Sequence, residues 1–269
     1  MSAPFLFERD GATAILTFNR PERRNAMCPE TVCRFADALD EIASDDAIRV
    51  AILTGAGDKA FCSGGDLALT LPLLSGDRAP QTEFDHRFLD DPRINDRIAA
   101  RGTAMNKPII AAVNGPCMAG GMEVLLSTDI RLAVPSAVFA LPEAARGVIP
   151  FAGALARLPR QIPYTAAMEI MLANVPMDAD TALRHGLINR IVAPEDLMTS
   201  ARELADRIAS HAPVSVQQIK ATVQAAMGRP LEDGFALEDA AKVRVMATED
   251  AREGPRAFME KRAPQYKGQ

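Results

Sequence analysis

Residues 107–123 read KPIIAAVNGPCMAGGME and join a short apolar run to a pair of glycines. The apolar run 109–113 predicts a buried strand, and the pair Gly120-Gly121 precedes a helical stretch. Glycine lets the backbone approach a ligand closely, and a helix N-terminus offers free N–H donors. This strand-to-helix junction therefore predicts a place where backbone amides hold an anion or a polarised oxygen.

A second glycine pair lies in SGGDL, residues 63–67, and it also follows a strand and precedes a helical stretch. One such pair alone would indicate a tight turn, because turns are the commonest role of glycine in loops. Two pairs in equivalent contexts favour a more specific arrangement. We expect the N–H groups of Gly65 and Gly120 to face each other and hold one oxygen between them.

Two carboxylates lie near the second pair. Glu123 falls within the first helical turn after Gly120, where an acidic residue could also simply stabilise the helix dipole. Glu143 follows Pro142, and its alternative role is that of an exposed loop carboxylate. If the two carboxyls converge near the oxygen-binding amides, they could act as general acid and general base on one substrate.

The first two thirds of the chain predict an α/β core. Alternating apolar and polar residues around Gly11 predict a hairpin over 5–18, and helical spacing after a proline predicts a helix over 29–43. Helical patterns separate the later strands, so strands should pack against helices. The later predicted strands are 49–54, 109–113, 130–134 and 137–141.

The last third of the chain predicts helices only. We divide the chain into a core over 1–193, which holds the site, and a helical region over 194–269. The helical region is a natural place for subunit contacts. Residues 71–96 are polar and irregular, which predicts a mobile loop beside the site.

Composition excludes several classes of protein. The chain has 269 residues, 48% of them hydrophobic and 24% charged, which is typical of a globular protein. Its net charge of −5 disfavours nucleic acid as a partner. No apolar run approaches 18 residues and no signal peptide is apparent, so we expect no membrane span and a cytoplasmic location. The 4 cysteines form no C-x-x-C pair and should be reduced, mostly buried thiols.

Other motifs have weaker support. Residues 55–60, GAGDKA, match a dinucleotide-binding pattern, but the FCSGG that follows is a poor helix former, so a glycine turn is favoured. The chain has 3 histidines and lacks H-E-x-x-H and G-x-S-x-G motifs. A serine–histidine triad and a histidine-rich metal site are therefore disfavoured.

Motifs along nearly the whole chain accompany the glycines and glutamates. On this set, the sequence closely resembles the crotonase (enoyl-CoA hydratase/isomerase) superfamily. The motifs are NRP at 19–21, KAFCSGGDL at 59–67, KPIIAAVNG at 107–115, GGME at 120–123, LPE at 141–143, GLIN at 186–189, TED at 248–250 and AFMEKR at 257–262.

The resemblance implies a crotonase-type α/β fold, a spiral of ββα units with a C-terminal helical trimerisation region. It also implies a homotrimer or a homohexamer. Gly65 and Gly120 match the two oxyanion-hole donors of the family, and Glu123 and Glu143 match its two catalytic glutamates. Relatives with other reactions often lack one or both glutamates. Keeping both favours an enoyl-CoA hydratase, which adds water syn to a 2-enoyl-CoA and gives a 3-hydroxyacyl-CoA.

The resemblance also implies how coenzyme A binds. It implies no metal and no tightly bound cofactor, since coenzyme A enters as part of the substrate. The positions along which CoA and its thioester arm run are Arg23, Arg24, Ser63, Asp66, Leu67 and Ala68. Phe258 and Lys261 match positions that reach the CoA of a neighbouring subunit.

The chain departs from the family pattern at two places. PFAGA at 150–154 replaces a common Pro-Gly-x-Gly-Gly run, so Phe151 adds bulk on the acyl side and leaves the chain-length preference open. Ala68 stands where a lysine is frequent. Isomerisation or dehydration of a specialised acyl-CoA remains the alternative reaction. A non-catalytic CoA-binding scaffold is the alternative of another class, and the two glutamates argue against it.

Overall fold

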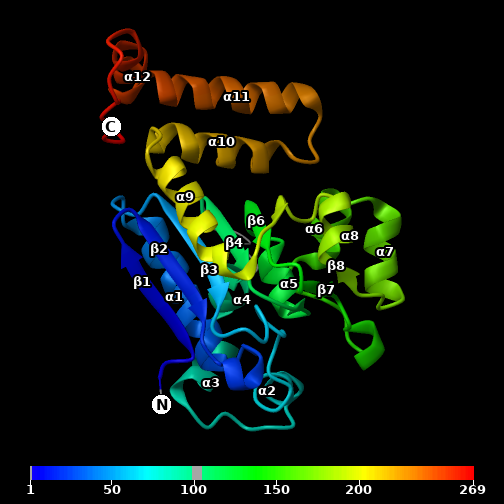
Figure 1. Cartoon of the computed structure of the whole chain (residues 1–269). Helices are drawn as coiled ribbons and strands as arrows, with labels where there is room; N and C mark the ends of the chain where they lie inside the picture. The colour runs from blue at the N-terminus through cyan, green and yellow to red at the C-terminus, as the bar shows by residue number, and fades with distance from the viewer. Residues whose placement is uncertain (1, 99–104) are drawn as a thin grey trace.

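The computed structural model describes residues 2–98 and 105–269, and these ranges form the expected α/β fold. Within them the main sheet has six strands (Figure 1). The first two strands form the predicted antiparallel hairpin, and the later neighbours pair in parallel through helical crossovers. In spatial order the strands are β1 (Phe5–Asp10), β2 (Thr13–Phe18), β3 (Val50–Gly55), β4 (Ile109–Val113), β6 (Ile130–Ala133) and β9 (Arg190–Ile191).

A smaller sheet carries the glycine-rich junction. Its strands are β5 (Cys117–Met118), β7 (Val138–Ala140) and β8 (Met177–Asp178), in that order. The predicted strand over 137–141 is therefore present as β7, but outside the main sheet. An isolated parallel bridge between Cys62 and Cys117 joins the loop after β3 to β5. Because each cysteine shortly precedes a glycine pair, this bridge brings the two pairs together.

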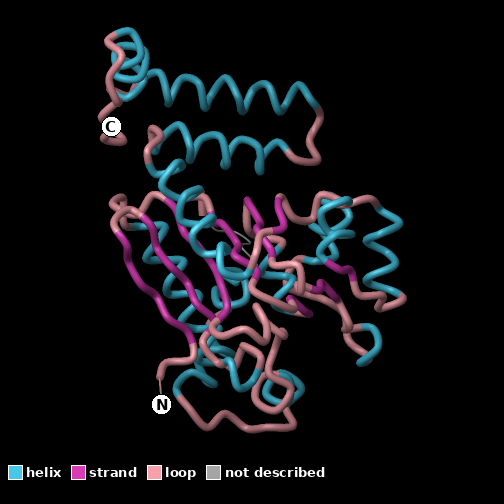
Figure 2. The backbone as a smooth tube through the Cα atoms, in the orientation of Figure 1, coloured by secondary structure: helices cyan, strands magenta, loops and turns pink. Residues whose placement is uncertain are grey.

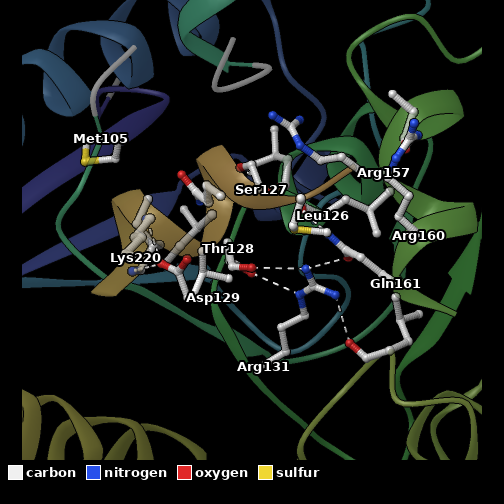
Figure 3. Close-up of a pocket in the computed structure, with 18 of the residues that line it drawn as sticks. Met105, Leu126, Ser127, Thr128, Asp129, Arg131, Arg157, Arg160, Gln161 and Lys220 are labelled. Carbon is white, nitrogen blue, oxygen red and sulfur yellow. Dashed lines mark hydrogen bonds and ion pairs between the residues drawn. The ribbon is translucent and has the colours of Figure 1, made fainter. Parts of the chain in front are cut away.

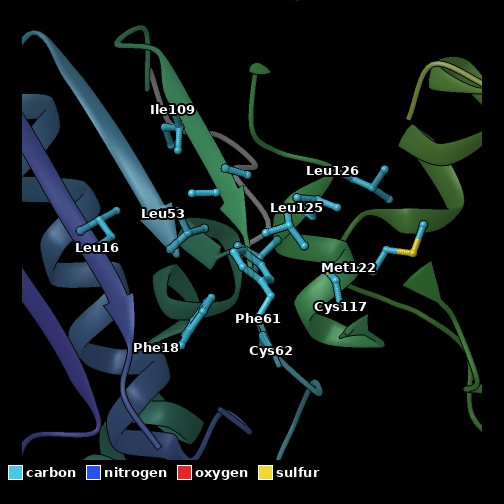
Figure 4. Close-up of a cluster of buried hydrophobic side chains, with 14 of the residues drawn as sticks. Leu16, Phe18, Leu53, Phe61, Cys62, Ile109, Cys117, Met122, Leu125 and Leu126 are labelled. Atoms are coloured by element: carbon cyan, nitrogen blue, oxygen red, sulfur yellow. The ribbon is translucent and has the colours of Figure 1, made fainter. Parts of the chain in front are cut away.

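Helix α1 (Pro29–Ser44) confirms the predicted amphipathic helix and closes the core over the hairpin. Its side chains at i, i+3 and i+7 spacing, Val32, Phe35 and Leu39, are buried. The Phe35 ring lies 5.3 Å from that of Phe5 and 5.8 Å from that of Phe18, between ring centroids. The same apolar core continues across β3 and β4 to α5 (Gly120–Leu125) (Figure 4).

Helices cover both faces of the main sheet. In Figure 1, α9 (Leu197–Ala209) crosses in front of β3 and β4, while α1 lies behind the sheet. The remaining helices mainly occupy the crossovers (Figure 2). They are α6 (Ala154–Gln161), α7 (Tyr164–Leu172) and α8 (Ala179–Arg184), with short 3-10 turns at η1 (Pro21–Arg23), η2 (Ala144–Arg146) and η3 (Pro194–Asp196).

The prediction of a loop over 71–96 is wrong. The segment holds α2 (Leu71–Ser75), α3 (Glu83–Asp90) and the start of α4 (Pro92–Ile98). At the start of α3, Thr82 Oγ1 accepts from the Asp85 N–H at 3.1 Å, and the Asp85 carboxylate accepts from the Thr82 N–H at 3.2 Å. This capping box stabilises a helix whose polar composition had suggested a loop.

The C-terminal helices project beyond the sheet. After α9, α10 (Pro213–Ala226) and α11 (Leu231–Met246) run beside each other, and neither has a buried residue. Helix α12 (Asp250–Met259) ends the arm, far from α2 in Figure 1. The described chain has no strand after β9, whereas α9 itself packs on the main sheet. The domain boundary at 193 stays a prediction.

The helices and the cysteines of the fold bear on two predictions, that of no membrane span and that of reduced, buried thiols. Across the described ranges, every helix falls short of the length and apolar character that a bilayer span requires. The four cysteines are free and buried, as predicted. Burial raises the pKa of the Cys62 thiol to about 12, so this thiol is un-ionised at neutral pH.

Candidate active site

A cavity of about 410 Å³ lies where β5, α5 and the loop after β3 meet. Apolar side chains from α1, α2 and α3 form part of its wall, among them Val32, Leu74 and Phe88. The cavity brings together most of the residues predicted for the site. These are Gly65, Gly120, Glu123 and Glu143, with Arg23, Ser63, Asp66, Leu67 and Phe151.

Backbone geometry leaves two N–H groups available at the cavity. The Met27 N–H donates to the Gly64 carbonyl at 2.8 Å, and the Asp66 N–H donates to the Met27 carbonyl at 2.9 Å. The N–H of Gly65, which lies between Gly64 and Asp66, takes no part in these hydrogen bonds. Gly120 is the first residue of α5, so its N–H has no acceptor within the helix. Neither N–H has an acceptor in the described part of the chain.

Close approach of the two glycine-rich segments explains why glycine is needed there. A Cβ at Gly120 would lie 3.6 Å from the Gly65 nitrogen, so the two amides are neighbours. A Cβ at Gly64 would lie 2.6 Å from the Ala119 Cβ, well inside van der Waals contact. These distances place the two unbonded amides close together in the cavity wall.

Ala119 holds an unusual backbone conformation directly before α5. Its φ of 50° and ψ of −127° are rare for any residue with a Cβ. The Ala119 N–H donates to the Ala140 carbonyl of β7 at 2.9 Å, which fixes this peptide against the smaller sheet. Such strain is typical of functional sites. Here it lies at the turn between β5 and α5, directly before Gly120.

Glu123 does not cap its own helix. Its side chain is 4% exposed, and Oε1 accepts from the Ala152 N–H at 2.6 Å and from the Ala154 N–H at 3.4 Å, at the start of α6. Burial raises the pKa of Glu123 to about 7, and these two N–H donors oppose the rise. The helix-dipole alternative is therefore not the role that the structure gives this carboxylate.

Glu143 is not an exposed loop carboxylate either. It precedes η2 and is 8% exposed, and its Oε2 has no hydrogen-bond partner among the described residues. Burial raises the pKa of Glu143, while the nearby Arg146 opposes this. The charge of Glu143 in turn contributes to the raised pKa of Glu123. Two buried carboxyls on one cavity favour a state in which one is protonated and the other ionised.

Asp66 lines the cavity, but its carboxylate is engaged in the loop. Oδ2 pairs with Arg20 at 2.7 Å, and Oδ1 accepts from the N–H of Ala68 at 2.9 Å. The chain after Gly65 therefore forms a turn stabilised by Asp66 and reaches α2 only at Leu71. The helical stretch predicted after this glycine pair is therefore present as α2, but Gly65 does not lie at its N-terminus.

Four predicted binding residues lie outside the cavity. Arg24 and Ala68 are exposed next to it, and the Arg24 carbonyl accepts from the Ser63 N–H at 3.1 Å. Phe258 is 85% exposed, and Lys261 follows it at the end of the C-terminal arm. In Figure 1, α12 lies far from α2 and α5, whose residues line the cavity, so neither residue is near the cavity of its own chain.

The sequence argument missed the amides of Ala152 and Ala154. These N–H groups reach Glu123 because Gly153 between them takes a φ of 111° and caps α6. The signal was present in PFAGA, where a glycine remains at position 153. In the same stretch, Phe151 lines the cavity and is 55% exposed.

Comparison with known proteins agrees with this geometry. A family model described as enoyl-CoA hydratase/isomerase matches residues 8–269, and the chain belongs to this family. Enoyl-CoA hydratase EchA19 of Mycobacterium tuberculosis is 40% identical over 97% of this chain and 95% of its own length. The carnitinyl-CoA dehydratase of Proteus mirabilis is 37% identical over 96% of both chains.

The solved structures give the same fold. Enoyl-CoA hydratase EchA1 from Mycobacterium marinum superposes with a TM-score of 0.87 at 33% identity and covers 100% of both chains. The crotonase-type fold is therefore confirmed. The family includes more than one reaction on acyl-CoA, so membership alone leaves the particular reaction open.

Proposed function

We propose that this chain is an enoyl-CoA hydratase, which adds water syn across the double bond of a 2-enoyl-CoA. The observation that carries the proposal is one cavity that holds both buried glutamates and both unbonded glycine amides. The amides of Gly65 and Gly120 would polarise the thioester carbonyl, and each such donor is typically worth about 3 kcal/mol in the transition state. A polarised carbonyl makes Cβ electrophilic and Cα basic once water adds.

The two glutamates would then divide the proton transfers. Ionised Glu123 takes a proton from water as the water attacks Cβ, and protonated Glu143 delivers a proton to Cα. A pKa near 7 for Glu123 keeps a large fraction of this base ionised at neutral pH. Burial raises the pKa of Glu143 as well, so the two carboxyls share a proton at neutral pH, and its assignment to Glu143 is part of the proposal. Coenzyme A enters with the substrate, and the reaction uses no metal or separate cofactor.

Elimination of water is the second candidate. Dehydration of a 3-hydroxyacyl-CoA is the reverse of hydration and uses the same groups, and relatives at 36–37% identity are carnitinyl-CoA dehydratases. A carnitinyl group carries a permanent positive charge. The cavity wall holds the carboxyls of Asp66, Glu123 and Glu143 beside Arg23 and Arg146, so its charge does not select against a cationic acyl group.

The experiment measures hydration of crotonyl-CoA and longer 2-enoyl-CoA thioesters, beside dehydration of carnitinyl-CoA. Glu123→Gln and Glu143→Gln should each lower kcat by roughly 10²-fold or more, with little change in CoA affinity. Glu195→Gln, an exposed glutamate on η3, is the matched control. If both cavity variants keep wild-type hydration, the mechanism is wrong. CoA binding in calorimetry without turnover of any thioester would instead indicate a scaffold protein.

We also propose that the chain works as a homotrimer or a homohexamer. Helices α10 and α11 bury no residue within one chain, although apolar side chains such as Phe235 and Val243 are 55% and 71% exposed on them. A second copy would cover this surface. Phe258 and Lys261 would then reach the CoA of the neighbouring chain, and Phe258→Ala should raise KM more than it lowers kcat.

A further inference from the structure

Helices α5 and α6 are joined at both of their ends. At the N-terminal ends, Glu123 of α5 accepts from the Ala152 and Ala154 N–H groups that open α6. At the C-terminal ends, Gln161 Nε2, on the last residue of α6, donates to the Leu126 carbonyl at 3.0 Å. The helices have only six and eight residues, so the two sets of contacts lie within about two helical turns of each other.

Arg131 of β6 completes the C-terminal joint (Figure 3). Arg131 as a whole residue is 6% exposed. Its guanidinium donates to Gln161 Oε1 at 2.9 Å. It also donates to the Thr128 carbonyl, just after α5, at 3.0 Å and to the Leu187 carbonyl at 3.0 Å. Its Nε also donates to the Thr128 hydroxyl at 3.2 Å, so uncharged oxygens hold this buried cation, which makes no ion pair among the described residues.

These contacts lie away from the catalytic cavity. Arg131 and Gln161 line a second cavity of about 650 Å³, which Figure 3 shows, and neither lines the cavity of Glu123. The two cavities share one described lining residue, Val124. Arg131 and Gln161 therefore have no route to a substrate in the catalytic cavity, and any effect on it must pass through the helices.

We propose that Arg131 and Gln161 are positioning residues, which fix α6 against the end of α5 and thereby hold the Ala152 and Ala154 amides on Glu123. The proposal rests on the proposed function, in which Glu123 is the base. The shorter of the two hydrogen bonds to Glu123, at 2.6 Å, comes from the N–H of Ala152. Ala152 lies in the loop directly before α6, so its position depends on that of the helix. A displacement of about 1 Å in a catalytic group can reduce the rate by roughly 10²-fold.

The test compares Gln161→Met with Arg160→Met. Arg160 is the neighbouring residue on α6, but it is exposed and donates to the Ala156 carbonyl of its own helix, so it does not join α5. Gln161→Met should lower kcat for crotonyl-CoA hydration about tenfold and leave KM nearly unchanged. The acidic midpoint of the kcat/KM profile should move upward by about half a pH unit, since ionised Glu123 loses N–H donors. Arg160→Met should match the wild type.

Arg131→Lys is the second variant, because a full loss of this buried cation could prevent folding. Lysine keeps the charge but lacks the planar fork that bridges Thr128 and Gln161, so the midpoint should move in the same direction. A purely structural role would lower the yield of folded protein and leave the midpoint in place. A wild-type midpoint in both variants overturns the proposal.

Hydrogen exchange of the backbone amides separates this inference from the proposed reaction. In Gln161→Met, the amides of Ala152 and Ala154 should exchange faster, while those of β3 and β4 stay protected. Unchanged exchange at these two amides would overturn the positioning role. If the wild type hydrates no enoyl-CoA, the proposed function fails, and the exchange measurement still tests the joint between the helices.

Discussion

At the scale of single residues, the site depends on a conflict between burial and ionisation. Burial, together with the nearby Glu143, raises the pKa of Glu123 to about 7, while backbone N–H groups oppose the rise. The folded pKa therefore lies above the ordinary value of 4.5. A carboxyl with a raised pKa destabilises the fold whenever it is ionised. The protein thus keeps a base near neutral pH at a cost in stability.

The first prediction concerns pH and stability. The stability associated with Glu123 is fully present below pH 4.5 and is lost as the pH rises through about 7. At pH 8, Glu123→Gln should therefore be more stable than the wild type, with an unfolding free energy higher by on the order of 1–3 kcal/mol. It should accordingly unfold at a higher temperature. At pH 4 the difference should vanish. Calorimetric melting at both pH values checks this, and an equal gap at both would contradict it.

The second prediction concerns activity and pH. Because Glu123 must be ionised to act as the base, kcat/KM for hydration should fall as the pH drops below about 7. The profile of the Glu195→Gln control should superpose on that of the wild type. An acidic midpoint near the ordinary glutamate value would show that Glu123 is not the titrating base.

At the scale of elements, two loops approach so closely that a single methyl group matters. Gly64 has a φ of 94°, and a Cβ there would lie 2.6 Å from that of Ala119 and 3.1 Å from the Gly120 nitrogen. Gly121 faces Cys62 in the same way, with a Cβ 2.5 Å from the Cys62 carbonyl oxygen. The loop after β3 and the start of α5 therefore fit together only with glycine at these positions.

The third prediction tests this fit. Gly64→Ala should destabilise the fold by roughly 2–4 kcal/mol and lower kcat strongly, because the added methyl pushes Ala119 and the Gly120 N–H out of place. Gly11→Ala is the matched control: Gly11 also has a positive φ, of 60°, but a Cβ there meets nothing within 4 Å. It should show only the backbone strain, about 1 kcal/mol, with unchanged kcat. Equal kcat losses in both variants would contradict the prediction.

At the scale of the whole molecule, the C-terminal helices leave apolar side chains exposed. The sheet and its covering helices form one core, while α10 and α11 extend from it without burying a residue. Two helices of 14 and 16 residues that contact each other gain little stability from their own packing. Contact with another copy would supply the missing burial.

The fourth prediction follows from this exposed arm. Val243→Asp, at a side chain 71% exposed in one chain, should shift the molecular mass in light scattering from a trimer or hexamer toward a monomer. Lys242→Asp, an exposed position beside it, controls for the added charge. A monomeric wild type would contradict the proposed assembly, and an unchanged mass in Val243→Asp would remove this face from the interface.

The sequence predicted much of the fold because its strongest signals are local. The hairpin around Gly11, α1 and the strands β3 and β4 follow from spacing within one element. The helices α2, α3 and α4 were missed because they have only five, eight and seven residues, too few for a clear helical period. Helix α3 depends on its capping box, and α3 and α4 pack against α1, which periodicity does not report.

By itself, the sequence determined the family, the two glycine pairs and the two glutamates, since these are matters of residue type and order. Only the tertiary structure decided what surrounds them. Glu123 meets amides 29 and 31 positions further along the chain, and Arg131 joins the ends of two helices it does not belong to. Burial and hydrogen bonding depend on residues that are distant in sequence, so the ionisation of the glutamates could not be predicted before the chain was folded.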